Sequence, residues 1–165
     1  MQRFEPAALE QLLAADQPLA RSLEDDVSVL IHLDIEYVNF DNPAAAFTDP
    51  WRAFALQDPV VGVIEELLTK WGIRPLHLIT GQGHHFVWRV PRDSDVEHEI
   101  TELAFPNAAG ENPTFNGLAL AMEYAAHRIK SEAALRSEIP VEITALHVGP
   151  GTSGQREMIS IDISE

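Results

Sequence analysis

The stretch that decides the fold is residues 27–40, which read VSVLIHLDIEYVNF. β-Branched, aromatic and other apolar residues dominate it, and an Asn-Pro pair at positions 42 and 43 follows, so the sequence predicts a β-strand that ends there. Successive side chains of a strand point to opposite faces. One face is therefore apolar and consists of Val29, Ile31, Leu33, Ile35 and Tyr37. The other face carries His32, Asp34 and Glu36, which indicates a strand with one side in the core and one polar side.

The segments around this strand predict an α+β domain. We expect one or two amphipathic helices over residues 3–23, broken near Pro18, and a loop over 44–58 with a short helix near 51–56. A helix over 60–71 should stop at Gly72. Strands over 76–80 and 84–90, a helix capped by Asp93 or Ser94, a helix over about 116–137 and a strand pair over 141–148 and 158–163 complete the order. Because two strands follow each other directly at two places, we expect a two-layer fold with an antiparallel or mixed sheet and packed helices.

Chain length and net charge restrict the number of domains and the classes of function that the sequence allows. The 165 residues suffice for a single domain, with an N-terminal helical segment over 1–26 and an α+β core over 27–165. With 11 basic and 26 acidic residues, the formal net charge is −15, which argues against a general coat for nucleic acid or anionic membranes. Metal-dependent phosphate chemistry remains open, because bound cations reverse the local sign of the field.

Two further features of composition bear on compartment and chemistry. The chain has no cysteine, which excludes disulfides, zinc–thiolate sites, iron–sulfur clusters and cysteine nucleophiles. No signal-peptide pattern and no apolar run of bilayer length is present in the sequence, so we expect a cytoplasmic protein.

The first candidate site is the pair Asp34 and Glu36. Two carboxylates two residues apart on a strand point to the same face, roughly 7 Å apart at their Cα atoms. Like charges held so close favour a divalent cation between them, and Mg²⁺ or Mn²⁺ prefers such oxygen ligands. The alternative is an ordinary solvated strand face.

The second candidate is the turn Gly81-Gln82-Gly83 with the two histidines that follow it. The glycines permit close backbone approach or positive φ. Strand alternation puts His84 on the core side and His85 on the polar side, together with Arg89. A histidine beside such a turn could contact a phosphate, and a structural hairpin histidine is the alternative.

The third candidate is Asp162 in the stretch ISIDIS, residues 159–164. Its isoleucines share one face, and Asp162 repeats the setting of Asp34 on the polar face of an apolar strand. If the two strands are neighbours, Asp34, Glu36 and Asp162 could converge on one or two metal ions.

The order and spacing of these three stretches resemble the archaeo-eukaryotic primase superfamily of primases and primase–polymerases. The residues that carry the resemblance are 31–36 (IHLDIE), 80–85 (TGQGHH) and 161–163 (IDI), within a region from about Val27 to the C-terminus. The resemblance implies a two-layer core with an RRM-like sheet. It also implies that Asp34, Glu36 and Asp162 are catalytic residues that hold two Mg²⁺ or Mn²⁺ ions, and that His85, with the turn glycines Gly81 and Gly83, binds the phosphates of a nucleoside triphosphate.

The implied activity is two-metal nucleotidyl transfer in DNA replication. From its location alone, Arg89 could add positive charge near the triphosphate, as could Arg74. Because the surface is acidic, we expect nucleic acid to bind weakly or with help from a partner, and no membrane binding. A protein partner or a homo-oligomer is possible.

Two other readings stay open. The chain could be a truncated or degenerate member of the superfamily that serves as a non-catalytic accessory domain and docks on a basic partner. It could also be a small metal-dependent phosphoesterase that uses His32, Asp34, Glu36 and His85. The primase-type reading requires Asp162 to lie on the same face of the sheet as Asp34.

Overall fold

A mixed five-stranded sheet forms the centre of the fold. The computed structural model describes residues 27–104, 113–143, 149–151 and 153–163. The strands are β1 (Ser28–Asn39), β2 (Leu76–Ile79), β3 (Gly83–Pro91), β4 (Val141–Ile143) and β5 (Glu157–Asp162), in the spatial order β2-β3-β1-β5-β4. All neighbours are antiparallel except β4 and β5, which are parallel. The predicted α+β class with a mixed sheet is confirmed.

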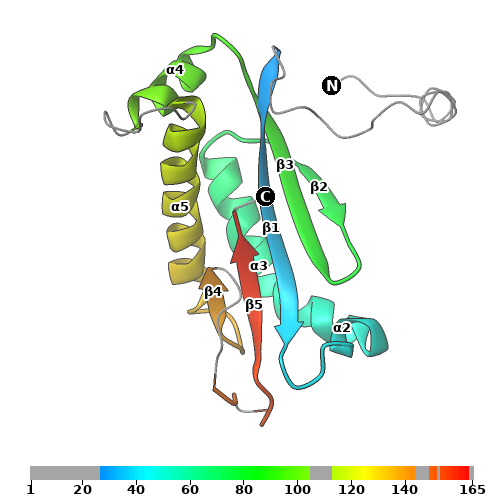
Figure 1. Ribbon diagram of the computed structural model, residues 1–165. Coiled ribbons are helices and arrows are strands. Elements are labelled where there is room, and N and C mark those ends of the chain that lie inside the picture. Colours follow the sequence, from blue (N-terminus) through cyan, green and yellow to red (C-terminus); the bar gives the residue numbers. More distant parts are fainter. Residues whose placement is uncertain (1–26, 105–112, 144–148, 152, 164–165) are drawn as a thin grey trace, which may run out of the picture.

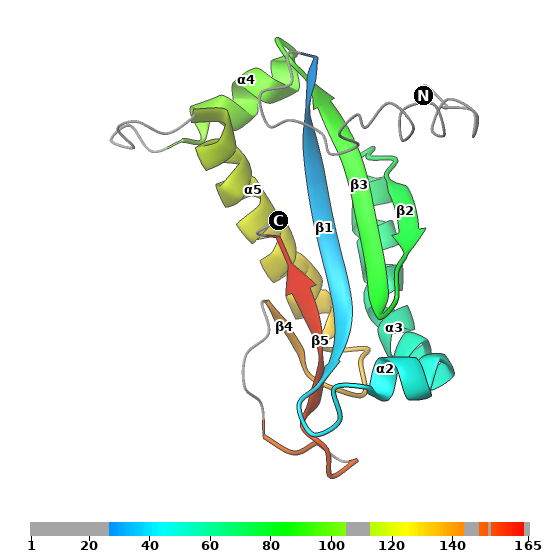
Figure 2. The ribbon, with the colours of Figure 1, turned by 45° about the vertical axis from the view of Figure 1, so that its right-hand side comes forward.

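The helices make the second layer. The described ones are α2 (Ala45–Thr48), α3 (Pro50–Lys70), α4 (Asp95–Glu102) and α5 (Pro113–Ala133). The long helices α3 and α5 lie against the same side of the sheet, which we call the helix face (Figures 1 and 2). The described residues place neither long helix on the opposite side, which we call the open face. None of the described helices has the length and apolar character needed to cross a membrane.

The central strand β1 has the alternation that its sequence predicts. Its apolar residues point to the helix face and are buried there against α3 and α5, together with residues of β3 and β5. The buried cluster includes Ile31, Leu33, Ile35, Tyr37, Val60, Val63, Ile64, Phe86, Ile129, Ile159 and Ile161. This core fixes which face each strand residue takes, because a shift of register by one residue would turn the apolar set toward the open face.

Helix α3 is longer than the sequence predicts: it contains the short helix expected near 51–56 and joins it to the helix expected over 60–71, so the loop expected over most of the rest of 44–58 is wrong. The Asp49 side chain accepts a hydrogen bond from the backbone N–H of Arg52, and Pro50 occupies the first turn, where its missing N–H costs nothing. The helix then continues through Pro59. Ala53 and Val60 lie on either side of that proline along the chain and are both buried, so core packing stabilises the helix across it.

The remaining elements are close to the expected ones. Ser94 caps α4, since its hydroxyl accepts a hydrogen bond from the backbone N–H of Glu97 at 3.2 Å. The last two strands are neighbours, as expected, and they run parallel to each other. The predicted helices over 3–23 and the far end of the strand over 141–148 lie outside the described residues.

Two helical glycines make a matched test of the packing between α4 and α5. A Cβ on Gly117 of α5 would lie 1.7 Å from the backbone oxygen of Ile100 in α4, whereas a Cβ on Gly62 of α3 would meet no atom within 4 Å. We expect Gly117→Ala to lower the free energy of unfolding by about 1–3 kcal/mol, because the helices must separate. Gly62→Ala should raise it by about 1 kcal/mol through helix propensity. Urea unfolding of both variants checks this, and equal effects would contradict the described α4–α5 contact.

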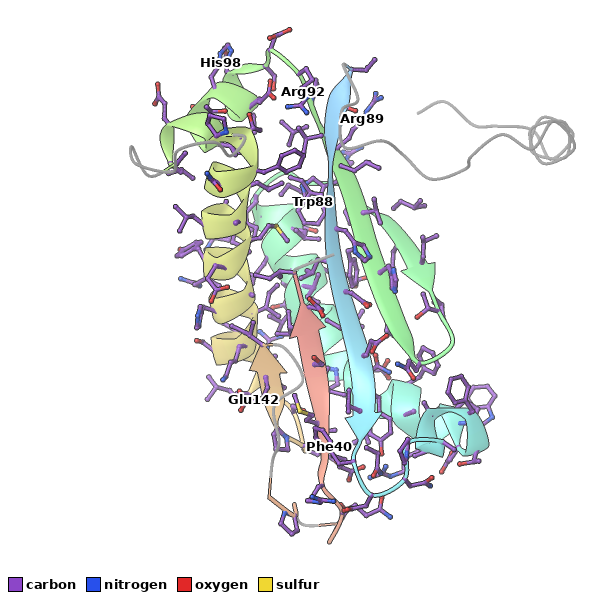
Figure 3. All side chains as sticks on the ribbon, viewed as in Figure 1. Phe40, Trp88, Arg89, Arg92, His98 and Glu142 are labelled. Atoms are coloured by element: carbon purple, nitrogen blue, oxygen red, sulfur yellow. The ribbon has the colours of Figure 1, made fainter. Side chains whose placement is uncertain are left out.

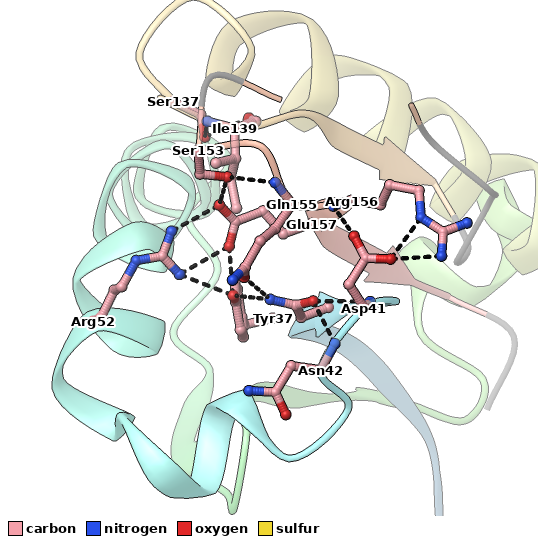
Figure 4. Close-up of polar contacts among 11 residues, drawn as sticks. Tyr37, Asp41, Asn42, Arg52, Ser137, Ile139, Ser153, Gln155, Arg156 and Glu157 are labelled. Carbon is pink, nitrogen blue, oxygen red and sulfur yellow. Dashed lines mark hydrogen bonds and ion pairs between the residues drawn. The ribbon is translucent and has the colours of Figure 1, made fainter. Parts of the chain in front are cut away.

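An ion pair between the partly exposed Arg52 and the buried Glu157 ties β5 to α3 and β1. The Glu157 carboxylate is fully buried and accepts hydrogen bonds from Arg52 at 2.7 and 2.8 Å, from the Tyr37 hydroxyl at 2.5 Å and from the Ser153 hydroxyl at 2.7 Å (Figure 4). These bonds, the one from Arg52 above all, lower the pKa of Glu157 to about 2. Burial and the bond to Glu157 raise the pKa of Tyr37. The network therefore fixes the end of β1 and the start of β5, the two strands that carry Asp34 and Asp162.

Candidate functional site

A cluster of polar side chains lies on the open face, on the three central strands of the sheet. It comprises His32, Asp34 and Glu36 of β1, His85 of β3, and Ser160 and Asp162 of β5, and we call it the open-face patch. Each of these residues alternates with a core residue of its strand. Burial of the apolar residues on the helix face therefore places the patch residues on the open face.

Asp34 is the centre of the patch. In the antiparallel register it stands directly opposite His85 on one neighbouring strand and directly opposite Asp162 on the other. Residues opposite each other share a face, and their Cβ atoms lie about 4.5–5.5 Å apart. The three stretches singled out in the sequence are therefore side by side, and Asp162 lies on the same face as Asp34.

A chain of contacts runs from Asp34 through both histidines. The Nε2 atom of His85 lies 3.1 Å from Oδ1 of Asp34, and its Nδ1 atom lies 2.8 Å from Nε2 of His32. Asp34 is only 5 % exposed, whereas the two histidines are partly exposed. A carboxylate held against one ring nitrogen fixes the orientation and the tautomer of an imidazole, so His85 is held in place from both sides.

Glu36 is fixed by the turn between β2 and β3. The Gln82 side-chain amide donates a hydrogen bond to the Glu36 carboxylate at 2.9 Å. The backbone oxygen of Gln82 accepts from the N–H of Tyr37 at 3.1 Å and from the amide of Gln57 at 3.2 Å. No local pattern marks Gln82 as this partner, because it lies 46 residues from Glu36 along the chain.

The turn glycines are needed for close approach and not for positive φ. A Cβ on Gly83 would lie 1.9 Å from the backbone oxygen of Ile35, and one on Gly81 would lie 3.2 Å from the ring of Phe47. Neither glycine has positive φ. Gly83 lets β3 pair tightly with β1 opposite Glu36, which brings the turn to the edge of the patch.

Arg89 lies on the same face as His85, opposite Leu30, four residues further along β3. It is exposed and makes no ion pair with any other described residue. Figure 3 shows it beside the upper part of β1, where Trp88, the residue before it, points toward the space between α5 and the sheet. Arg74 precedes β2 and is not a sheet residue. Arg89 is thus the cation on the face of the patch.

The other histidine of the turn belongs to the core, as strand alternation predicts. His84 is 6 % exposed on the helix face, edge-on to Phe54, and its Nδ1 atom lies 2.8 Å from Nε2 of His77. Burial, and next the nearby His77, lower the pKa of His84. This pair is separated from the open-face patch by the sheet itself.

The side chains of the open-face patch carry the type of ligand atom that a divalent cation prefers. Asp34, Glu36 and Asp162 offer carboxylate oxygens, which Mg²⁺ and Mn²⁺ prefer. Carboxylates directly opposite each other on neighbouring strands repel, and a cation would relieve that repulsion. Within the described ranges, no three His, Asp or Glu side chains stand at the spacing of metal ligands. Glu36 would have to exchange its bond with Gln82 for one to the cation.

Comparison with known proteins returns no relative: no protein-family model, curated protein or solved structure matches the chain. Inference about function therefore starts from the open-face patch.

Proposed function

We propose that the open-face patch binds a nucleoside triphosphate together with divalent cations and carries out primase-type nucleotidyl transfer. The observation that supports this most is the register of β1, which puts Asp34 opposite both His85 and Asp162 on an open face. These residues come from three separate stretches of the sequence, and the register brings all three to one level of the sheet.

Asp34, Asp162 and Glu36 would hold Mg²⁺ or Mn²⁺. When bound, such cations favour deprotonation of an attacking hydroxyl and neutralise charge on the phosphoryl group. Asp34 orients the His85 imidazole through Nε2, and the Nδ1 atom of His85 would exchange its contact with His32 for a hydrogen bond to a phosphate oxygen. Arg89, exposed on the same face, would attract the triphosphate from solution.

The acidic surface restricts which nucleic acid could serve as the second substrate, the acceptor of the nucleotide. With a formal net charge of −15, the chain has little means of gripping a long polyanion by itself. The proposed activity therefore extends a primer that is short or that another protein holds. The nucleic acid binds to this chain weakly or through that partner.

One observation favours the phosphoesterase as a second candidate. The His32–His85 contact at 2.8 Å places two imidazoles beside Asp34, and imidazole suits Zn²⁺ or Mn²⁺ in hydrolytic sites. This function would show as hydrolysis of a phosphate ester without any transfer to a hydroxyl acceptor other than water.

Calorimetry tests the binding step. We expect wild-type protein to bind a nucleoside triphosphate only when Mn²⁺ is present, and Asp162→Asn to lose about tenfold or more of that affinity. Glu99→Gln, which removes an exposed acid of α4, is the matched control and should bind as the wild type does. Binding that is equally tight without metal, or equal in wild type and Asp162→Asn, would count against the proposal.

A further inference from the structure

A large apolar groove lies mainly on the helix face, and Leu30 and Arg89 of the open face also line it. It has a volume of about 1100 Å³ and lies between α4, α5, the chain just after α3, and the upper parts of β1 and β3. Its lining is largely apolar and includes Trp88, Ile100, Leu118, Ala121, Met122 and Ala125. On α5, residues 118, 121, 122 and 125 recur at helical spacing, so this stripe faces the groove along its length.

The groove also leaves large apolar side chains exposed. Val96 of α4 and Leu103, the residue that caps the end of α4, are 53 % and 52 % exposed, and Tyr124 of α5 is 60 % exposed. All three line the groove, with Trp71 at the opposite rim. A contiguous apolar surface of this kind normally has something packed on it.

The chain that leads into β1 arrives at this groove. Leu30 of β1 lines it, and Ser28 pairs with Pro91, which lines it as well. Residues 1–26 precede that point, and 14 residues separate Leu13 from Val27. At about 3.3–3.6 Å per residue, such a length of chain reaches well past the width of a helix-sized groove.

The sequence of that segment matches the groove in character. Leu9, Leu12 and Leu13 have the i, i+3, i+4 spacing of one helix face, while Glu10 and Gln11 fall on the other. The acidic run Glu24-Asp25-Asp26 precedes β1 and is opposite in charge to Arg74. Arg74 lines the groove and makes no ion pair with another described residue.

We propose that residues 7–16 dock as an amphipathic helix in this groove, with Leu9, Leu12 and Leu13 against α4 and α5. The N-terminal segment then completes the core on the helix face, and the groove is not a site for a small molecule or for another protein. This proposal is independent of the activity proposed for the open-face patch.

The absence of cysteine permits a clean test in the full chain. Ala121→Cys puts a thiol in the groove, and Ala119→Cys puts one on the exposed side of α5, outside the groove. In the otherwise unaltered chain, we expect a maleimide to label position 121 roughly tenfold or more slowly than position 119, because the docked leucines cover it. Equal labelling rates would overturn the proposal without the need for any variant of the N-terminal segment.

Paired charge variants then identify the occupant. Leu9→Asp with Leu13→Asp should accelerate labelling at position 121 to the rate of position 119. Gln11→Asp with Ala14→Asp adds the same charge to the opposite helix face and should leave position 121 protected. Circular dichroism and the rate at position 119 report whether each variant is folded. Protection of position 121 that persists in the Leu9/Leu13 variant, or that disappears on dilution as expected for a second copy of the chain, would overturn the proposal.

Discussion

Asp34→Asn is expected to abolish metal-dependent nucleotide binding and transfer while leaving the fold intact. Asp34 stands opposite both His85 and Asp162 and is almost fully buried, so it is the carboxylate that the other patch residues surround. Changes to the residues that support metal ligands lower metal affinity by up to about 100-fold. The loss of a direct ligand should lower the affinity for metal and nucleotide by at least that much. Asparagine has the same shape and still accepts a hydrogen bond from His85.

The stability of the same variant separates a functional carboxylate from a structural one. Removing one of two opposed carboxylates relieves repulsion between β1 and β5, so the melting temperature of Asp34→Asn should equal or exceed that of the wild type without metal. Added Mn²⁺ and nucleotide should raise the melting temperature of the wild type but not of the variant. A variant that loses both stability and binding would instead indicate that Asp34 holds the sheet together.

The second large effect is expected at Glu157. Glu157→Ala removes the acceptor for Arg52, Tyr37 and Ser153 and leaves these groups without their buried partner. The pKa of Glu157 falls from 4.5 to about 2 in the folded protein, and that difference corresponds to about 3 kcal/mol of stability. We expect a loss of that order in chemical unfolding at pH 7. Glu66→Ala breaks the exposed pair with Arg136 and, as the matched control, should cost far less, because solvent screens an exposed ion pair.

The pH dependence of the Glu157 effect has a defined sign. Because the pKa is lower in the folded than in the unfolded state, the carboxylate contributes its full stability above pH 4.5 and loses it as the pH falls toward 2. The difference in unfolding free energy between wild type and Glu157→Gln should therefore shrink over this range. A difference that stays constant from pH 6 to pH 2.5 would mean that the charge of Glu157 does not stabilise the fold.

Much of the site could be predicted from strand alternation alone. Over residues 31–37 of β1 and 159–162 of β5, apolar residues alternate with polar ones, and each polar set must face away from the core once the apolar set is buried. That rule places Asp34 and Asp162 on the open face and separates His84 from His85. It works here because the period of a strand is two and one face is fully apolar.

Other features could not be predicted because they depend on pairs distant in the sequence. Arg52 and Glu157 are 105 residues apart, and no local pattern marks either as a partner of the other. The continuation of α3 through Pro59 reflects tertiary packing that overrides the local helix-breaking tendency of proline. The close contact of Gly117 with Ile100 likewise exists only once α4 and α5 are packed.

The central claim is that the open-face patch, and no other acidic surface of this acidic chain, holds a divalent cation with a nucleotide. Paramagnetic broadening by Mn²⁺ in NMR spectra of the full chain, recorded with a nucleoside triphosphate, tests it residue by residue. We predict that the backbone signals of Asp34, His85 and Asp162 broaden first, at substoichiometric Mn²⁺, and that Asp34→Asn removes this broadening. Broadening that begins instead at the exposed acids of α4, or spreads evenly over the surface, would contradict the claim.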